Sequence, residues 1–488
     1  MPCPPRNSSG RVTAHMNRAA RALPTLLVGL LHVGSLHVGF VLVGLVLVAC
    51  EAAPEAPRRP HLLLVTLDTT RADHTSLFDP ARATTPALRA LAAEGASFAA
   101  AYAPSPSTGP THASLFTGLH PIGHGLLKNT LSLPDALPSL PAVLADAGYE
   151  TGAVVSSFVL HSRFGFARGF ASYRDDFPAE QATLELEHWE GLELEDGFDR
   201  RADHTSDLAL GWLRERDPAR PFFLFVHYFD PHLPYTPPPD FAARFDSGAE
   251  PGSTREAVDR YDAELAFTDR ELGRLLDGLE ALGVAEETLV VVAGDHGEGL
   301  MDHGHMEHGI HLFEEAVRVP WVWRWPGEID TGRAIEGPVQ LVDLAPTLLA
   351  MLGVEVAASF HGVDLSPALL EGAPLDAERP LFLQTDRPAS LRQLRNLRGA
   401  QWAVGEMFGV RAGPWKLLED RRRGERALYH LEHDPQERRD LLAAEPERAA
   451  ELAETLASWK REHLRAAPAA PELTEREIEA FRALGYVE

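Results

Sequence analysis

Carboxylates and histidines stand at the ends of apolar runs, where they could do chemistry. Asp68 directly follows the run HLLLVTL, and Asp295 with His296 follows the run TLVVVA. Taken alone, a carboxylate in such a place is often a turn former or a helix cap. Four more histidines follow closely, a density at which rarely all are core residues. They are His303, His305, His308 and His311.

A hydroxyl-rich segment, TGPTHASLFTG, begins at Thr108. Its hydroxyls could simply cap a helix that begins near Thr111. A hydroxyl nucleophile at the start of a helix would also gain electrostatic stabilisation. The backbone N–H groups and the positive end of the helix dipole stabilise both an attacking alkoxide and an anionic group in transfer. The segment therefore predicts either a helix cap or the reacting end of a helix.

Buried strands that alternate with helices must position these residues. Continuous apolar runs bounded by turns predict central strands at 61–67, 151–155, 221–227 and 288–293. Helical patterns lie between them at 87–94, 137–147 and 261–282. This alternation predicts an α/β fold with a mostly parallel central sheet flanked by helices. Ligands gather beyond the carboxyl ends of such strands, so Asp68, Asp230 and Asp295, each just past a run, should converge at one rim.

The composition of the chain changes near residue 385. An arginine-rich stretch, 387–398, is followed by strand-like pieces at 408–418 and 427–430. A last helix with alternating Glu and Arg, 446–465, reads as a solvated surface helix. We expect a catalytic domain over 61–385 and a small C-terminal α+β subdomain with the terminal helix over 386–488.

The N-terminus, 1–50, has the pattern of a membrane-targeting segment. An almost unbroken apolar run extends from Leu23 to Ala49 and ends in LVAC, which resembles a bacterial lipobox with Cys50 as the lipidated residue. An uncleaved transmembrane anchor is the alternative, because ~20 apolar residues suffice to span a bilayer. The run stops at the cysteine and a Pro/Ala tether follows at 51–60, which favours the lipoprotein. Both alternatives place the rest of the chain outside the cytoplasm.

The composition excludes several classes of partner and chemistry. Cys3 and Cys50 are the only cysteines, so the part of the chain after Cys50 has no disulfide and no cysteine nucleophile. The formal net charge is -26, and no basic stripe interleaved with aromatic residues occurs. Nucleic acid is therefore not an expected partner. The acidic surplus is spread widely and says nothing about the charge of a substrate.

Taken in order, the motifs resemble the sulfatase family of the alkaline phosphatase superfamily. The order is a strand with DTTRAD, then TGPTHASLFTGLHPIGHG, HYFDPHLPY, GDHGE and HGIHLFEEAVRVP. Two supporting segments, VDLAPT and GPWKL with LYHLEHDP, are similar too. The resemblance covers about residues 60 to 440. It implies an alkaline phosphatase-like fold and a hydrolase that acts on sulfuric or phosphoric esters.

The resemblance also implies roles for particular residues. One divalent cation would be held by Asp68, Thr108, Asp295 and His296, with Thr108 also at the position of the nucleophile. Oxygen ligands with one imidazole suit Ca, Mg or Mn better than Zn, although Zn is possible. The remaining residues would act on the substrate: Asn129, His232 and His308 in catalysis, and Arg71, His112 and Lys416 in binding.

Alternatives remain for three of these positions. Asp230, before Pro231, fits a turn former at least as well as a ligand of a second metal. Lys416 could be a surface lysine. Arg71 could form a structural pair with a neighbouring carboxylate.

Departures from the family pattern bear on the chemistry. Formylglycine sulfatases carry C-x-P-S-R or S-x-P-S-R, where this chain has Thr108-Gly109-Pro110-Thr111-His112. Oxidation of a threonine would give a ketone, so a true formylglycine is not expected. Thr69 replaces the second aspartate of the family's DD pair, and the sulfate-clamping G-K-W-H segment aligns with VSSF at 155–158. Asn129, 21 residues after Thr108, stands where phosphodiesterase relatives place an oxyanion-holding amide.

These features predict a metal-dependent hydrolase that cleaves sulfate or phosphate-type esters through a threonine nucleophile. The alternatives are a phosphodiesterase or phosphonate hydrolase, or a phosphoethanolamine-type transferase, acting on envelope lipids or glycans. A further alternative from another class is an inactive lipoprotein that binds anionic glycans. The expected partners are an anionic ester substrate and, through the N-terminus, a membrane. The expected location is the bacterial cell envelope, in the periplasm or at the outer membrane.

Overall fold

The structure is a computed structural model that describes residues 59–182, 188–189, 192–194, 197–355, 360–386 and 406–463. The predicted lipobox, the tether up to residue 58 and the arginine-rich stretch lie outside these ranges. Within them, no helix is long and apolar enough to cross a membrane.

A nine-stranded, mostly parallel sheet forms the centre of the described chain, as the sequence predicts. The strands follow the order β11-β2-β10-β8-β1-β7-β3-β4, and β9 pairs with β2. Pairing is parallel except for β10, which runs against β2 and β8, and β9, which runs against β2. The strands are β1 (His61–Leu67), β2 (Ala96–Tyr102), β3 (Glu150–Val154), β4 (Ser172–Arg174), β7 (Phe222–Tyr228), β8 (Thr288–Gly294), β9 (Arg318–Val319), β10 (Trp321–Arg324) and β11 (Arg333–Gln340).

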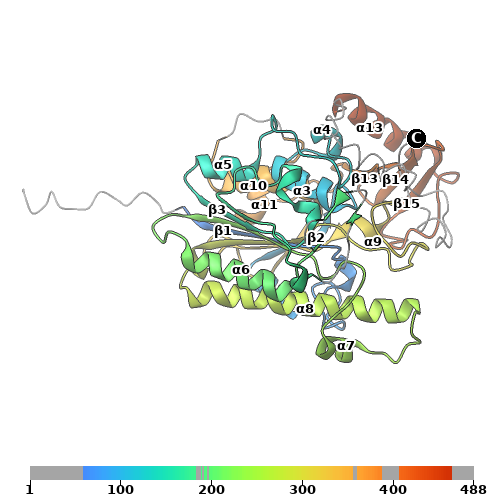
Figure 1. Cartoon of the computed structure of the whole chain (residues 1–488). Helices are drawn as coiled ribbons and strands as arrows, with labels where there is room; N and C mark the ends of the chain where they lie inside the picture. The colour runs from blue at the N-terminus through green and yellow to red at the C-terminus, as the bar shows by residue number, and fades with distance from the viewer. Residues whose placement is uncertain are drawn as a thin grey trace, which may run out of the picture. The chain divides into compact units, whose positions relative to one another are not determined.

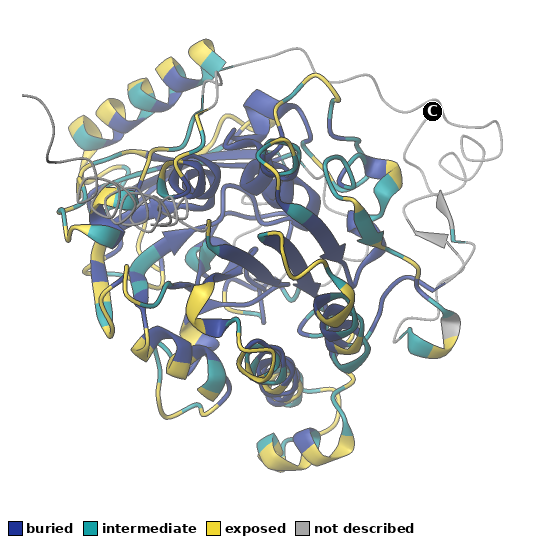
Figure 2. Cartoon of the chain, turned by 90° about the vertical axis from the view of Figure 1, so that its left-hand side faces the viewer, coloured by how far each residue is buried: buried dark blue, intermediate teal, exposed yellow. Residues whose placement is uncertain are grey.

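Helices cover both faces of this sheet (Figure 1). Side chains of β1 alternate between two cores: Leu62 and Leu64 pack on the side of α3, α5 and α10, and Leu63 and Val65 pack on the side of α2, α6 and α8. In Figure 2 the strands carry the colour of buried residues and the outer faces of the helices are exposed. The helices are α2 (Pro86–Ala93), α3 (Thr108–Thr117), α4 (Pro121–His124), α5 (Leu140–Asp146), α6 (Ala202–Glu215), α7 (Pro239–Phe245), α8 (Thr254–Ala281), α9 (Glu314–Val317), α10 (Leu344–Met351) and α11 (Ser366–Leu370).

Helix α3 begins at Thr108, three residues before the start that the sequence suggested. Ser107 has an extended backbone and Pro110 lies in the first turn, where its missing N–H costs nothing. Thr108 is therefore the first residue of the helix, where the positive end of the helix dipole lies. Gly118, in the left-handed conformation, ends the helix.

A second, antiparallel sheet has four strands in the order β12-β13-β14-β15. Its strands are β12 (Leu381–Thr385), β13 (Met407–Ala412), β14 (Trp415–Asp420) and β15 (Arg426–His430). β12 precedes the boundary at residue 385, and Gly413 splits the predicted 408–418 strand into β13 and β14. The terminal helix α13 (Pro446–His463) is not simply a solvated surface helix, because Leu452, Leu456 and Trp459 pack against this sheet.

The short elements complete the fold. A two-stranded sheet pairs β5 (His188–Trp189) with β6 (Leu192–Glu193). The 3-10 helices are η1 (Ala72–His74), η2 (Phe158–Leu160), η3 (Ser162–Phe164), η4 (Ala179–Gln181), η5 (Ala285–Glu287) and η6 (Leu341–Asp343).

Candidate active site

Register brings the two strand-end aspartates together. Leu67, the last residue of β1, pairs with Tyr228 of β7 on one side and with Gly294 of β8 on the other. The Asp68 N–H donates to the Tyr228 carbonyl at 2.9 Å, and the Asp295 N–H donates to the Leu67 carbonyl at 3.2 Å. The three strands therefore end level, and their next residues share one rim of the sheet.

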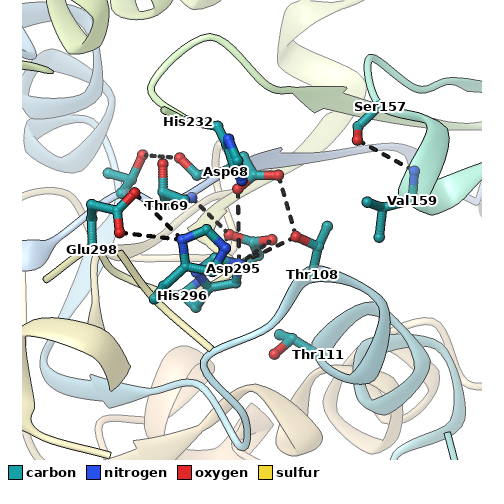
Figure 3. A network of polar contacts seen from close by, with 12 residues as sticks. Asp68, Thr69, Thr108, Thr111, Ser157, Val159, His232, Asp295, His296 and Glu298 are labelled. Atoms are coloured by element: carbon teal, nitrogen blue, oxygen red, sulfur yellow. Dashed lines mark hydrogen bonds and ion pairs between the residues drawn. The ribbon is translucent and has the colours of Figure 1, made fainter. Parts of the chain in front are cut away.

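Asp68, Asp295 and His296 form a buried group that could hold a metal ion (Figure 3). One ligand atom from each lies within 4.8 Å of the others, and all three side chains are fully buried. The His296 Nδ1–H donates to the Gly297 carbonyl at 2.9 Å, so its Nε2 keeps a lone pair toward the carboxylates. That nitrogen lies 3.8 Å from Asp68 Oδ1 and 3.7 Å from Asp295 Oδ2.

The charge balance of this group fits a cation. Asp68 Oδ1 and Asp295 Oδ2 are buried and accept no hydrogen bond. Burial raises the pKa of Asp68, and the charge of Glu298 raises it further. Burial and then the charge of Asp68 raise the pKa of Asp295. Two buried carboxylates with unsatisfied oxygens need a positive partner, and oxygen-rich ligands with one imidazole suit a divalent cation.

Thr108 lies against this group from the start of α3. Its hydroxyl donates to Asp68 Oδ2 at 3.4 Å, and Oγ1 is 3.2 Å from His296 Nε2. The neighbouring Gly109 N–H donates to Asn129 Oδ1 at 2.9 Å, which leaves the amide nitrogen of Asn129 to other partners. The structure thus brings Asp68, Thr108, Asp295 and His296 into one cluster, with Asn129 beside it.

Two further predicted residues border the cluster from the side of His296. The His308 ring lies 4.5 Å from that of His296 and 4.9 Å from that of His232, between ring centroids. His308 Nδ1 is 3.2 Å from Glu298 Oε1, and burial raises the pKa of Glu298 to about 7. The His232 Nδ1–H donates to the Leu233 carbonyl at 2.6 Å. Both imidazoles are therefore oriented by groups of the protein.

The three residues predicted to bind substrate have protein partners. Arg71 lies 2.7 Å from carboxylate oxygens of both Asp73 and Asp302, the structural pairing that the sequence left open. Lys416 is fully buried, and its Nζ lies 2.9 Å from a Glu314 oxygen rather than in the metal-holding group.

His112 has bonds at both ring nitrogens. Its Nδ1–H donates to the Thr108 carbonyl at 2.8 Å, and the Thr66 hydroxyl lies 2.9 Å from its Nε2. The substrate-binding roles of Arg71, His112 and Lys416 stay predictions. Asp230 Oδ1 accepts a hydrogen bond from the Ala202 N–H at the start of α6 and is in neither metal-holding group of the described residues.

The sequence analysis assigns no role to two residues of the site, although it names Thr69 as a departure from the family pattern. Thr69 has a φ of 48°, unusual for a β-branched residue, and its N–H donates to Asp295 Oδ1 at 3.1 Å while its buried hydroxyl has no partner. His227 Nε2 lies 3.2 Å from Asp68 Oδ2. One signal could have found His227: it is a polar residue near the end of an otherwise apolar strand, in register with Thr66, two residues before Asp68.

Comparison with known proteins decides the family. The family model for sulfatases matches residues 60–354, and a model of the C-terminal part of N-sulphoglucosamine sulphohydrolase matches residues 302–463. The chain belongs to the sulfatase family. It is therefore a hydrolase of sulfuric or phosphoric esters, and the fold and the buried Asp/His group agree with this.

Proteins similar to this sulfatase-family chain include, by name, a sulfatase and a phosphonate monoester hydrolase. An ulvan-active sulfatase of Formosa agariphila is 24% identical over 68% of this chain and 69% of its own length. A multifunctional alkaline phosphatase superfamily protein of Trinickia caryophylli, PehA, is 26% identical over 67% of this chain and 80% of its own. The crystal structure of a phosphonate monoester hydrolase of Agrobacterium radiobacter has the same fold, with a TM-score of 0.67 and 23% identity over 86% of this chain and 99% of that one.

Proposed function

We propose that this chain cleaves anionic esters through an unmodified Thr108. Its turnover of phosphodiester or phosphonate esters would be at least comparable to that of sulfate esters. The observation that carries the proposal is the place of Thr108 Oγ1, which lies at the first residue of α3 and within 3.4 Å of Asp68 Oδ2 and 3.2 Å of His296 Nε2. A hydroxyl there lies at the positive end of the helix dipole on one side and against the metal-holding group on the other.

Asp68, Asp295 and His296 would hold one divalent cation, with Thr108 as a further ligand. The unsatisfied oxygens Asp68 Oδ1 and Asp295 Oδ2 support this assignment, and so does the lone pair on His296 Nε2. When bound, the cation would supply positive charge that favours the Thr108 alkoxide and the transferred group. The oxygen-rich set favours Ca, Mg or Mn.

The reaction would proceed in two displacements. Thr108 Oγ1 attacks the sulfur or phosphorus, the bond to the alcohol breaks, and His308 gives a proton to the leaving oxygen. Water then attacks the same atom and gives a proton to His308, the bond to Thr108 breaks, and sulfate, phosphonate or a phosphate monoester leaves while the Thr108 oxygen regains the proton that it lost in the first displacement. His232 and the Asn129 amide would donate hydrogen bonds to the transferred anion.

The choice of threonine favours phosphorus. A formylglycine hydrate has a second hydroxyl that expels sulfate by C–O cleavage, whereas threonine has one hydroxyl and must wait for water to attack the covalent ester. That route is well suited to phosphorus. The names of similar proteins include both an ulvan-active sulfatase and a phosphonate monoester hydrolase. They support an anionic ester, such as a sulfated glycan, as the substrate class.

Turnover of a substrate panel by wild type and two variants tests the proposal. The panel contains aryl sulfate, aryl phosphate, aryl phosphodiester and phosphonate esters, each with Ca, Mg, Mn or Zn. Thr108→Ala should lower kcat by several powers of ten with the fold intact, while Thr108→Ser should retain much of the activity. Peptide mass should show plain threonine. Robust sulfate hydrolysis without phosphoester turnover would overturn the preference for phosphorus, and wild-type rates in Thr108→Ala would overturn the mechanism.

The proposed site of action is the bacterial cell envelope, outside the cytoplasm, with the chain attached through a lipid on Cys50. The lipobox-like LVAC and the Pro/Ala tether after it support this. In a bacterial host, a labelled fatty acid should mark the wild type and not Cys50→Ser. Absence of label from both proteins would favour an uncleaved anchor instead.

A further inference from the structure

A second buried group adjoins the proposed metal site. His112, His227 and Asp295 each offer a ligand atom within 4.8 Å of the others, and all three are fully buried. Since Asp295 belongs to both groups, a second cation beside the first would be the simplest explanation. The hydrogen bonds of the two histidines argue for a different role.

His112 has no unoccupied lone pair for a cation. Its Nδ1 faces the Thr108 carbonyl at 2.8 Å, and since a carbonyl only accepts, Nδ1 must carry the proton. Its Nε2 then accepts from the Thr66 hydroxyl at 2.9 Å. Both nitrogens are occupied, one of them by the backbone of the proposed nucleophile.

The tautomer of His227 is set in the opposite sense. The Ser156 N–H donates to its Nδ1 at 3.4 Å, so this nitrogen is the acceptor and Nε2 carries the proton. Nε2 points at Asp68 Oδ2, 3.2 Å away. A cation in the second group would need a lone pair where this ring has a hydrogen.

We infer that His227 is a positioning residue that holds Asp68 in its metal-binding orientation, and that His112, His227 and Asp295 do not bind a second cation. The inference rests on the proposed role of Asp68 as a metal ligand. Asp68 Oδ2 accepts from His227 Nε2–H and from the Thr108 hydroxyl, which leaves Oδ1 without a partner and available to the cation. Such outer hydrogen bonds fix the rotation of a ligating carboxylate.

Two substitutions separate the bonds of His227. In His227→Asn the short amide can still accept from the Ser156 N–H but cannot reach Asp68. In His227→Gln the amide nitrogen lies where Nε2 was and can still donate to Asp68. Both replacements are polar, so a difference between them reports on the bond to Asp68 rather than on burial or charge.

His124 provides a matched control. It is buried, its Nδ1 accepts from the Leu126 N–H at 3.1 Å, and its Nε2 lies 3.0 Å from the Ser114 hydroxyl. It therefore has the same pattern of partners as His227, except that its acceptor is not a proposed metal ligand. His124→Asn should cost a similar hydrogen bond without an effect on metal binding.

Calorimetric titration of Mn²⁺ into the metal-stripped full chain tests the inference. Wild type and His124→Asn should bind one Mn²⁺ with equal affinity, His227→Asn should bind it about 10- to 100-fold more weakly, and His227→Gln should recover to within a few-fold. Unchanged affinity in His227→Asn would overturn the inference. So would two Mn²⁺ per wild-type chain falling to one in the variant, which would make His227 a ligand. A wild type that binds no Mn²⁺ would instead remove the metal assignment itself, and the inference with it.

Discussion

Two buried carboxylate clusters in this chain differ in the source of their positive charge. In one, Asp68 and Asp295 lie together, and within the described residues neither forms an ion pair with a lysine or an arginine. In the other, Glu314 and Glu437 lie 2.9 and 3.0 Å from the Lys416 ammonium. Burial alone would lower the pKa of Lys416, but the two glutamates raise it above its ordinary value. The second cluster contains a cationic side chain of the protein, Lys416, whereas the first would take its positive charge from a bound metal ion.

This difference separates a structural cluster from a functional one. Burying a charge without a partner costs on the order of several kcal/mol. A fold therefore keeps such groups only if a charge of the opposite sign compensates them. In the Lys416 cluster the compensation is covalently part of the chain and permanent. In the Asp68 cluster it would arrive with a metal ion, and the same ion would supply the charge that hydrolysis needs.

One substitution in each cluster should have opposite consequences for stability, and the largest effect of all is expected on activity at Asp295. Asp295→Asn keeps an oxygen that can accept from the Thr69 and His296 N–H groups, but it removes a ligand charge. We expect a loss of activity of at least about 10³-fold, equivalent to ~4 kcal/mol of transition-state stabilisation. The metal-free variant should unfold no more easily than wild type, because the repulsion from Asp68 is gone. Lower stability of the metal-free variant in urea would contradict this.

Removing the built-in cation should instead destabilise the fold. Lys416→Met leaves Glu314 and Glu437 buried without their partner, which should lower the free energy of unfolding by ~3–5 kcal/mol. Lys460→Met is the control, because Lys460 is partly exposed beside Glu419 and should contribute less than about 1 kcal/mol. Urea unfolding measures both. A Lys416→Met protein that is stable but has a raised KM would support the substrate-binding role predicted from the sequence.

The sequence predicts the first cluster better than the second. Asp68 and Asp295 follow continuous apolar runs, and parallel strands that end level bring such residues to one rim. Lys416 gives no such signal, since it lies in an antiparallel strand and its partners come from α9 and a distant loop. The roles of Thr69 and His227 were missed because the backbone conformation of Thr69 and the ring tautomer of His227 depend on neighbours far along the chain.

Among the strands and helices, too, those with a clear local pattern were predicted better than those that depend on distant contacts. The central strands β1, β7 and β8 were predicted within a residue or two because they are apolar throughout. The terminal helix was misread as solvated, since its buried face has only a few apolar residues among many charges. Those residues, Leu452, Leu456 and Trp459, are spaced to cover one face of the helix, which only the packing against the second sheet makes evident.

The Lys416 cluster has two glutamates for one lysine, which predicts that the stability of the protein depends on pH. Burial raises the pKa of Glu437 to about 7, although the charge of Lys416 opposes the shift. A glutamate with a raised folded-state pKa contributes stability that is complete below its unfolded value, near 4.5, and is lost as pH rises through about 7. Glu437→Gln removes this titrating group. The free energy of unfolding of wild type should therefore fall by about 1–3 kcal/mol relative to that of the variant between pH 4.5 and 8. Parallel stability curves for the two proteins would contradict the assignment.

The smallest expected effect concerns the strained residue of the first cluster. Thr69 has a φ of 48°, which costs a β-branched residue of order 1 kcal/mol, and its buried hydroxyl lacks a partner. Thr69→Gly relieves both, against the extra backbone entropy of glycine, so the metal-free chain should gain up to about 1 kcal/mol. Activity should fall ~10-fold, since Asp68 and Asp295 are then held by a looser backbone. Ala83→Gly, at an exposed residue with a φ of 51°, isolates the backbone effect and should leave activity unchanged. If Thr69→Gly keeps wild-type activity and Mn²⁺ affinity, the strain at Thr69 does not serve the cation site.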